Sequence, residues 1–98
     1  MTYIFEVYDK TKRRIYLTEE RWHHILKHPE MYNIMFEEMI MILQYPIAIK
    51  DYKLEENVKY YYGYFKNRTA KAKYLRIIVK YLNGKGFIIT AYFIEAIQ

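Results

Sequence analysis

Apolar and polar residues alternate with a period near two at the start of the chain, in residues 3–8 and again in residues 14–17. A period of two places successive side chains on opposite faces of a strand. The five residues between these stretches, Asp-Lys-Thr-Lys-Arg, are polar and typical of a turn. We therefore expect two short strands that can pair as a hairpin.

The period changes to that of a helix at Thr18. Its hydroxyl can accept a hydrogen bond from a free N–H group in the first turn of a helix, and Glu19 and Glu20 bring negative charge to the positive end of the helix dipole. Pro29 removes a backbone donor and disfavours helical backbone at His28. The sequence predicts a helix that begins after Thr18 and ends at about His28.

This helix gathers cations beside its apolar side. Winding it at about 100° per residue collects apolar residues in one arc: Trp22, Ile25, Leu26 and Pro29. Arg21, His24 and His28 fall together just beyond the Ile25 edge of that arc. His23 lies on the far flank. Polar side chains at the border of a buried face can point into a cleft and act there, while the apolar side of the helix stays packed.

A second helical period covers residues 34–44. Its apolar residues lie on one side of the helix: Met35, Phe36, Met39, Ile40, Ile42 and Leu43. Glu37, Glu38 and Gln44 lie on the other side. We expect Asn33 to cap this helix and Pro46 to end it, and we interpret the apolar side as core.

The period returns to two after Pro46. It predicts four strands, at residues 47–52, 58–65, 74–82 and 87–94. Asn83-Gly84 is typical of a two-residue hairpin turn between the last two. The order of elements predicts an α+β fold, in which an N-terminal strand or hairpin is followed by two helices that pack on one face of a four-stranded or larger antiparallel sheet. Residues 1–98 are enough for a single domain.

The sheet face away from the helices is predicted to be basic. One alternating set in the last two strands suits the covered face: Leu75, Ile77, Val79, Tyr81, Ile89, Ala91 and Phe93. The other set is then exposed: Arg76, Ile78, Lys80, Ile88, Thr90 and Tyr92. Residues 60–64 place tyrosine on both faces, so their register stays open.

Charge and tyrosine content favour a polyanionic partner. The 16 Lys and Arg residues exceed the 11 Asp and Glu residues by five, and the 13 tyrosines suit half-buried strand positions but can also stack on unpaired bases. RNA is the partner we expect. The chain has no cysteine, which excludes disulfides and thiolate chemistry. It shows no signal peptide and no apolar run of about 20 residues, so we expect a cytoplasmic protein without membrane contact.

The polar residues can support metal-free cleavage of RNA. This reaction needs a base for the 2′-hydroxyl proton, an acid for the leaving oxygen, and positive charge for the transition state. His24 and His28 can act as base and acid, Arg76 can supply the charge, and Thr90 and Tyr92 can donate hydrogen bonds. The same residues also suit the solvated side of a helix and a solvated strand face, and this alternative stays open.

A metal site is the other possible use of the first helix. Glu20, His24 and His28 are spaced at i, i+4 and i+8, and a histidine pair at i, i+4 can bind zinc. The pair lacks the adjacent glutamate of the His-Glu-x-x-His motif, and no cysteine is present. We expect neither a metal nor a cofactor.

Five segments of the sequence resemble a known family. They are RIYLTEERWHHILKHPEM, LQYPIAIKDY, YYYGYF, KYLRIIVKYL and FIITAYFI. Together they resemble the phage-associated nuclease-like domains of the barnase, EndoU, colicin and RelE group, and more distantly the BrnT and RelE toxins. The resemblance covers about residues 13–95, and it is most specific in residues 24–30 and in the closing Ile-Thr-Ala-Tyr.

The resemblance implies a metal-independent ribonuclease fold with its catalytic face on the sheet and the first helix. It matches His24 and His28 to the family histidines, Glu30 to the acidic residue after the proline, and Arg76 to the basic strand position. Thr90 and Tyr92 fall in the final motif. The resulting catalytic set is His24, His28, Arg76, Thr90 and Tyr92, and the expected substrate-binding set is Glu30, Lys80, Tyr61 and Tyr62.

These residues lead to two expectations of function. The first is an endoribonuclease or toxin-like domain that cleaves RNA and, if toxin-like, has an antitoxin protein that covers its basic face. The second is a non-catalytic RNA-binding or protein-interaction module on the same fold, with the tyrosines as its stacking or partner surface.

Overall fold

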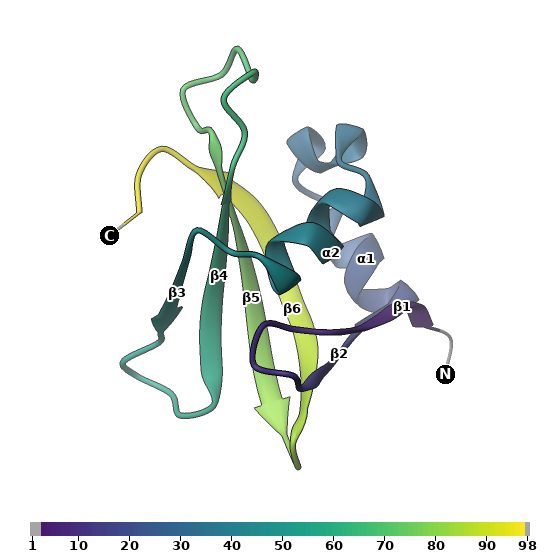
Figure 1. Ribbon diagram of the computed structural model, residues 1–98. Helices are drawn as coiled ribbons and strands as arrows, with labels where there is room; N and C mark the ends of the chain where they lie inside the picture. The colour runs from purple at the N-terminus through teal and green to yellow at the C-terminus, as the bar shows by residue number, and fades with distance from the viewer. Residues whose placement is uncertain (1–2, 98) are drawn as a thin grey trace.

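The computed structural model describes residues 3–97 and has an α+β architecture, with helices on one side of a six-stranded sheet (Figure 1). The helical elements are α1 (Glu19–Ile25), a 3₁₀ helix η1 (Pro29–Asn33) and α2 (Phe36–Gln44). The strands are β1 (Tyr3–Tyr8), β2 (Arg14–Thr18), β3 (Ala48–Asp51), β4 (Val58–Tyr64), β5 (Tyr74–Leu82) and β6 (Lys85–Ile94). None of the helices in this part of the chain is long and apolar enough to cross a membrane.

The sheet is mixed and open, with the strand order β1-β2-β6-β5-β4-β3. The antiparallel hairpin of β1 and β2 and the antiparallel run from β3 to β6 agree with the prediction. The expectation of a purely antiparallel sheet is wrong at one junction, because β2 pairs with β6 in parallel, Arg14 opposite Lys85 and Tyr16 opposite Phe87. The alternation of a strand indicates its faces, but it does not indicate which strand will lie beside it.

Some helix ends differ from the predicted ones, because of a proline and of local hydrogen bonds. The Thr18 hydroxyl accepts a hydrogen bond from the Arg21 N–H at 3.1 Å, which confirms the predicted cap. Helix α1 ends at Ile25, three residues earlier than expected, and His28 has extended backbone before Pro29 opens η1.

The start of α2 differs from the prediction in the same way. Asn33 closes η1, so it does not cap α2. The helix begins after Met35 instead, and the Glu38 carboxylate accepts a hydrogen bond from the Met35 N–H at 2.9 Å. A glutamate that reaches back to the N-cap N–H satisfies one of the donors that the helix leaves free.

The core lies between the helices and one face of the sheet. It joins Ile25 of α1 and Met39 of α2 to Leu75 and Ile77 of β5. Gly63 of β4 is on the same face, where an added Cβ would overlap the Ile42 side chain of α2. The close approach of α2 to the sheet therefore requires glycine at this position.

A β-bulge in β6 changes the predicted faces of two isoleucines. Thr90 pairs with Ile78 and Ile88 pairs with Val79, so Ile89 is an extra residue between the two pairs. Ile88 is consequently buried under the helices, and the expectation that Ile89 packs there and Ile88 is exposed is wrong. Thr90 keeps its expected position on the other face.

The turn that follows β5 agrees with the prediction. Asn83 and Gly84 have φ angles of 54° and 79°, the left-handed values that a tight hairpin turn requires. The turn sets β6 antiparallel to β5 and fixes which side chains of the two strands lie opposite each other.

Candidate functional site

Strand pairing settles the register of the tyrosines in β4. Tyr61 pairs with Ile77 and lies on the face that the helices cover, whereas Tyr60 pairs with Ile78 and Tyr62 with Arg76. We call the opposite side of the sheet the open face. Its central residues are Tyr16, Tyr60, Tyr62, Arg76, Ile78, Lys80, Phe87, Thr90 and Tyr92.

Arg76 is the centre of a tyrosine cluster on the open face. Its Nε donates a hydrogen bond to the Tyr62 hydroxyl at 3.1 Å, and its NH1 group donates one to the Tyr92 hydroxyl at 3.2 Å. The guanidinium also lies 4.7 Å from the ring centroid of Tyr60. Three phenols on β4 and β6, the two strands that flank β5, thus hold one half-buried cation by hydrogen bonds and by contact with an aromatic face.

The surroundings of Arg76 and Tyr60 determine the protonation states of their side chains. Burial on its own lowers the pKa of Arg76, but the hydrogen bonds to Tyr92 and Tyr62 outweigh this effect and raise the pKa overall. Burial raises the pKa of Tyr60 above its ordinary value of 10.0, and the Arg76 charge only partly offsets this. The site therefore presents a permanent cation beside a neutral phenol at neutral pH.

The first helix brings a histidine to this cluster. Strand β2 stays beside β6 as far as Tyr16, opposite Phe87, and the chain then enters α1, which packs chiefly against β6. The His28 ring lies 5.5 Å from the Tyr92 ring, measured between centroids.

Tyr92 therefore contacts both His28 and Arg76. The His28 side chain is 42% exposed, so a ligand can reach it. Its Nδ1 lies 3.9 Å from Oε1 of Glu30, which leaves Nε2 as the nitrogen farther from the carboxylate. An imidazole, a guanidinium and a phenol on one surface are groups that can move protons and bind a phosphate.

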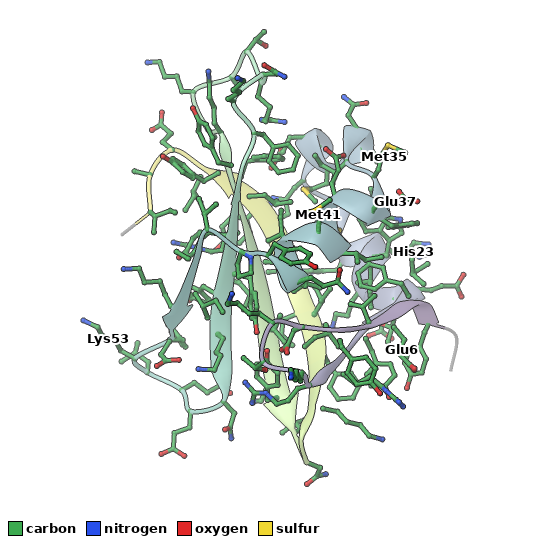
Figure 2. All side chains as sticks on the ribbon, viewed as in Figure 1. Glu6, His23, Met35, Glu37, Met41 and Lys53 are labelled. Atoms are coloured by element: carbon green, nitrogen blue, oxygen red, sulfur yellow. The ribbon has the colours of Figure 1, made fainter. Side chains whose placement is uncertain are left out.

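The other two histidines have different surroundings. His24 is an exposed residue of the last turn of α1, four residues before His28 in the chain. His23 is also exposed, and Figure 2 shows it on the outer side of α1, away from the sheet. His23 is thus a natural control for the other two, because it is also a histidine and lies close to them in the chain.

Thr90 lies on the open face two residues from Tyr92. Among the buried side-chain nitrogen and oxygen atoms of residues 3–97, Oγ1 of Thr90 is the one without a hydrogen-bond partner. An unpaired buried hydroxyl is uncommon and costs free energy. The Oγ1 atom of Thr90 is buried and Tyr92 lies two residues away on the same face, so Thr90 suits a positioning role.

The residues that we expected to bind the substrate lie on different faces of the sheet. Lys80 lies on the open face and forms an ion pair with Glu55, at 2.5 Å between Nζ and Oε1. Tyr62 is on the same face but fully buried, so it can hold Arg76 in place but cannot itself touch a ligand. The expectation for Tyr61 is wrong, because Tyr61 is buried on the covered face. Residue 61 points opposite to residues 60 and 62, as alternation along a strand requires.

A second polar cluster lies on the covered face and was not predicted from the sequence. Asp9 in the turn between β1 and β2 is 4% exposed and accepts hydrogen bonds from the hydroxyls of Tyr61, at 2.9 Å, and Tyr81. It also accepts bonds from the backbone N–H groups of Thr11 and Arg13. The Asp-x-Thr pattern suggests a local turn bond, but no pattern shows that this aspartate will be buried by strands far away in the sequence.

The cluster around Asp9 has a defined protonation state. Burial raises the pKa of Tyr61 to about 12, with a further increase from its bond to Asp9, and burial also raises that of Tyr81. Burial alone would raise the Asp9 pKa, but the bonds from Thr11, Tyr81, Arg13 and Tyr61 together lower it. One carboxylate thus joins the hairpin turn to β4 and β5 as a charged acceptor.

In residues 3–97 no three histidine, aspartate or glutamate side chains are close enough to hold a metal ion. No family model matches the chain, and neither a curated protein nor a solved structure matches it significantly. The function is therefore argued from the geometry of the open face.

Proposed function

We propose that this protein is a metal-independent endoribonuclease or toxin-like domain that binds and cleaves RNA on the open face, as its resemblance to the barnase, EndoU, colicin and RelE group implies. The observation that carries the proposal is that His28 and Arg76, from segments far apart in the sequence, both contact Tyr92. A proton-transfer group and a phosphate-binding group are thus neighbours on an accessible surface.

The reaction follows from the chemistry of these groups. His28 removes the proton of a ribose 2′-hydroxyl, whose oxygen forms a bond to the adjacent phosphorus. The bond from phosphorus to the 5′-oxygen of the next nucleotide breaks, and this oxygen takes a proton from an acid, for which His24, an exposed residue of the last turn of α1, is the candidate. The products are a 2′,3′-cyclic phosphate and a free 5′-hydroxyl, and no oxidant or metal is needed.

Arg76 and Tyr92 stabilise the negative charge of the transition state. A guanidinium has five N–H donors, and two of its nitrogens bond to phenols here, so further donors remain for phosphate oxygens. The Tyr92 oxygen accepts a bond from Arg76, and its own hydrogen stays available for donation. Donors fixed before the substrate binds need no reorganisation during the reaction.

Cleavage of a mixed-sequence RNA in EDTA tests the proposal. We expect wild-type protein and the His23→Gln variant to cleave at the same rate, His28→Gln to be about 10² to 10⁴-fold slower, and Arg76→Ala about 10² to 10³-fold slower. Each variant is first compared with wild type by thermal unfolding. Absence of cleavage by wild-type protein on every RNA offered, or equal losses in His23→Gln and His28→Gln, would refute the catalytic assignment.

The aromatic content of the open face favours RNA binding without catalysis as the second candidate. The Tyr52 and Tyr60 rings are stacked, with centroids 5.6 Å apart and planes 24° apart, and Tyr64 and Tyr74 form a second pair at 5.0 Å. Exposed aromatic rings beside cations suit unpaired bases. RNA binding that weakens with salt but leaves the RNA intact selects this candidate. Absence of both binding and cleavage points to a protein partner, such as an antitoxin that covers this face.

A further inference from the structure

A groove of about 440 Å³ opens at the β2 end of the open face. It lies between the first turn of α1 and strands β5 and β6. Its apolar lining is Tyr16, Leu82, Phe87, Ile88 and Ile89, and its polar lining is Thr18, Glu19, Glu20, Arg21 and Lys80. Neither the reaction above nor the Arg76 cluster uses this space.

The apolar wall of the groove is aromatic and rigid. The rings of Tyr16 and Phe87 are stacked, with centroids 5.5 Å apart and planes 24° apart. Tyr16 packs on Tyr3 at its other side and is only 5% exposed, so it supports Phe87, which is partly exposed and is the ring that a ligand can reach. A flat, preformed apolar wall is the surface that a nucleobase needs for stacking.

The polar lining of the groove contains both positively and negatively charged side chains. Arg21 and Lys80 can bind the phosphates on either side of a base, and Lys80 is held by its ion pair with Glu55. Glu19 and Glu20 can only accept hydrogen bonds when ionised. Carboxylates that line an apolar groove favour the exocyclic amino group of cytosine, adenine or guanine, which offers two N–H hydrogens, over uracil, which offers only its N3–H.

The groove also lies at a suitable distance from the proposed reaction site. Lys80 and Arg76 are four residues apart on β5 with their side chains on the same face, which corresponds to roughly 13 Å at the rise of an antiparallel strand. Phe87 is opposite Lys80 and Tyr92 is opposite Arg76. One single strand of RNA that crosses the open face along β5 and β6 can therefore contact both places.

We propose that this groove is a base-binding subsite, in which a nucleobase with an exocyclic amino group stacks on the Phe87 ring, which Tyr16 supports from behind, and donates to Glu19 or Glu20. The proposal rests on the proposed action of the protein on RNA. It adds a sequence preference, against uracil, at a position close to the phosphate held by Arg76.

The test titrates the ¹⁵N-labelled protein with each of the four nucleoside 5′-monophosphates and follows the backbone amide signals. We expect the monophosphates of adenosine, cytidine or guanosine to shift the amides of Phe87 and Ile89, with at least one binding about fivefold or more tightly than uridine monophosphate. Equal affinities for all four, or shifts centred on Arg76 alone, would overturn the subsite.

A matched pair of variants tests the role of the carboxylates. The double variant Glu19→Gln, Glu20→Gln removes two charges from the first turn of α1, and Glu37→Gln, Glu38→Gln removes two from the first turn of α2. We expect the first pair alone to abolish the preference over uridine monophosphate. An equal loss in both pairs would overturn the role of the groove.

The same proteins distinguish this proposal from the one on which it rests. If wild-type protein cleaves RNA but the positions of cleavage are the same in the Glu19→Gln, Glu20→Gln variant, the subsite is wrong and the nuclease proposal stands. If no RNA is cleaved but the groove amides still shift with the expected base preference, the nuclease proposal is wrong and base binding stands.

Discussion

The two faces of the sheet each carry one charged residue bonded to two tyrosines, and the two clusters behave differently. On the covered face Asp9 accepts hydrogen bonds from Tyr61 and Tyr81, and on the open face Arg76 donates to Tyr62 and Tyr92. Asp9 is 4% exposed, whereas Arg76 is only half-buried. The same residue types therefore serve different purposes according to what covers them.

The direction of the hydrogen bonds explains the difference. Around Asp9 the phenols use their hydrogens on the carboxylate or on each other, with the two hydroxyl oxygens 2.7 Å apart, so the cluster is satisfied within the protein. Around Arg76 the phenols act as acceptors, and the hydrogen of Tyr92 remains free. A satisfied buried network contributes to stability, while donors left free on a surface are available for a ligand.

Removal of the central charge is expected to have the largest effect on stability at the covered face. Asp9→Ala leaves two buried phenols and two backbone N–H groups without their acceptor, and we expect a loss of about 2 to 4 kcal/mol in the free energy of unfolding. Arg76→Ala is expected to cost about 1 kcal/mol or less. Urea unfolding monitored by tryptophan fluorescence measures both. Equal losses would show that the two clusters are equivalent in the fold.

Replacement of one tyrosine by phenylalanine in each cluster compares the contribution of a single hydroxyl to stability. Tyr81→Phe removes a bond to a buried carboxylate, so we expect a loss of about 1.5 to 3 kcal/mol. Tyr92→Phe removes a hydroxyl from the open face, so we expect a change within about 0.5 kcal/mol and weaker RNA binding. The two measurements are urea unfolding and fluorescence anisotropy with a labelled RNA. A larger loss of stability in Tyr92→Phe would contradict the distinction.

The smallest expected effect is on the pH dependence of stability. Because the folded-state pKa of Asp9 is below its ordinary value of 3.8, the unfolded chain binds a proton more readily as the pH falls. The contribution of Asp9 is therefore complete above about pH 5 and is lost as the pH falls through the folded-state pKa. The free energy of unfolding should fall less steeply below pH 5 in Asp9→Asn than in wild type.

Asp51→Asn is the matched control for this measurement, because Asp51 is exposed and pairs with Lys59 on the surface. Its pH profile should follow that of wild type, since a surface ion pair contributes little to stability. A parallel profile for Asp9→Asn and wild type would mean that Asp9 has no special role in acid unfolding.

Local signals in the sequence were sufficient for most of the elements. Thr18 capped the first helix because its hydroxyl and the N–H it binds are three residues apart, and Asn83-Gly84 formed its turn because both residues tolerate left-handed backbone. The six strands were recognisable from alternation alone. These features depend on neighbours within a few residues, which is the range over which a sequence pattern can be interpreted.

The candidate site is formed by residues that lie far apart in the sequence. The sequence indicated Arg76, Tyr92 and His28, but it could not indicate that Tyr61 turns away from them or that Asp9 is buried against β4 and β5. It also gave no sign of the groove, because Tyr16 and Phe87 meet only through the parallel pairing of β2 with β6.

The sequence by itself determined which segments are helices and strands, where most of them begin, and that basic and tyrosine residues alternate with apolar ones near the end of the chain. Only the tertiary structure decided the parallel neighbour of β6, the bulge at Ile89 and the register of Tyr60 to Tyr62. The physical reason is that a shift of one residue exchanges the two faces of a strand. The register is fixed by the packing of the whole core, to which every segment contributes.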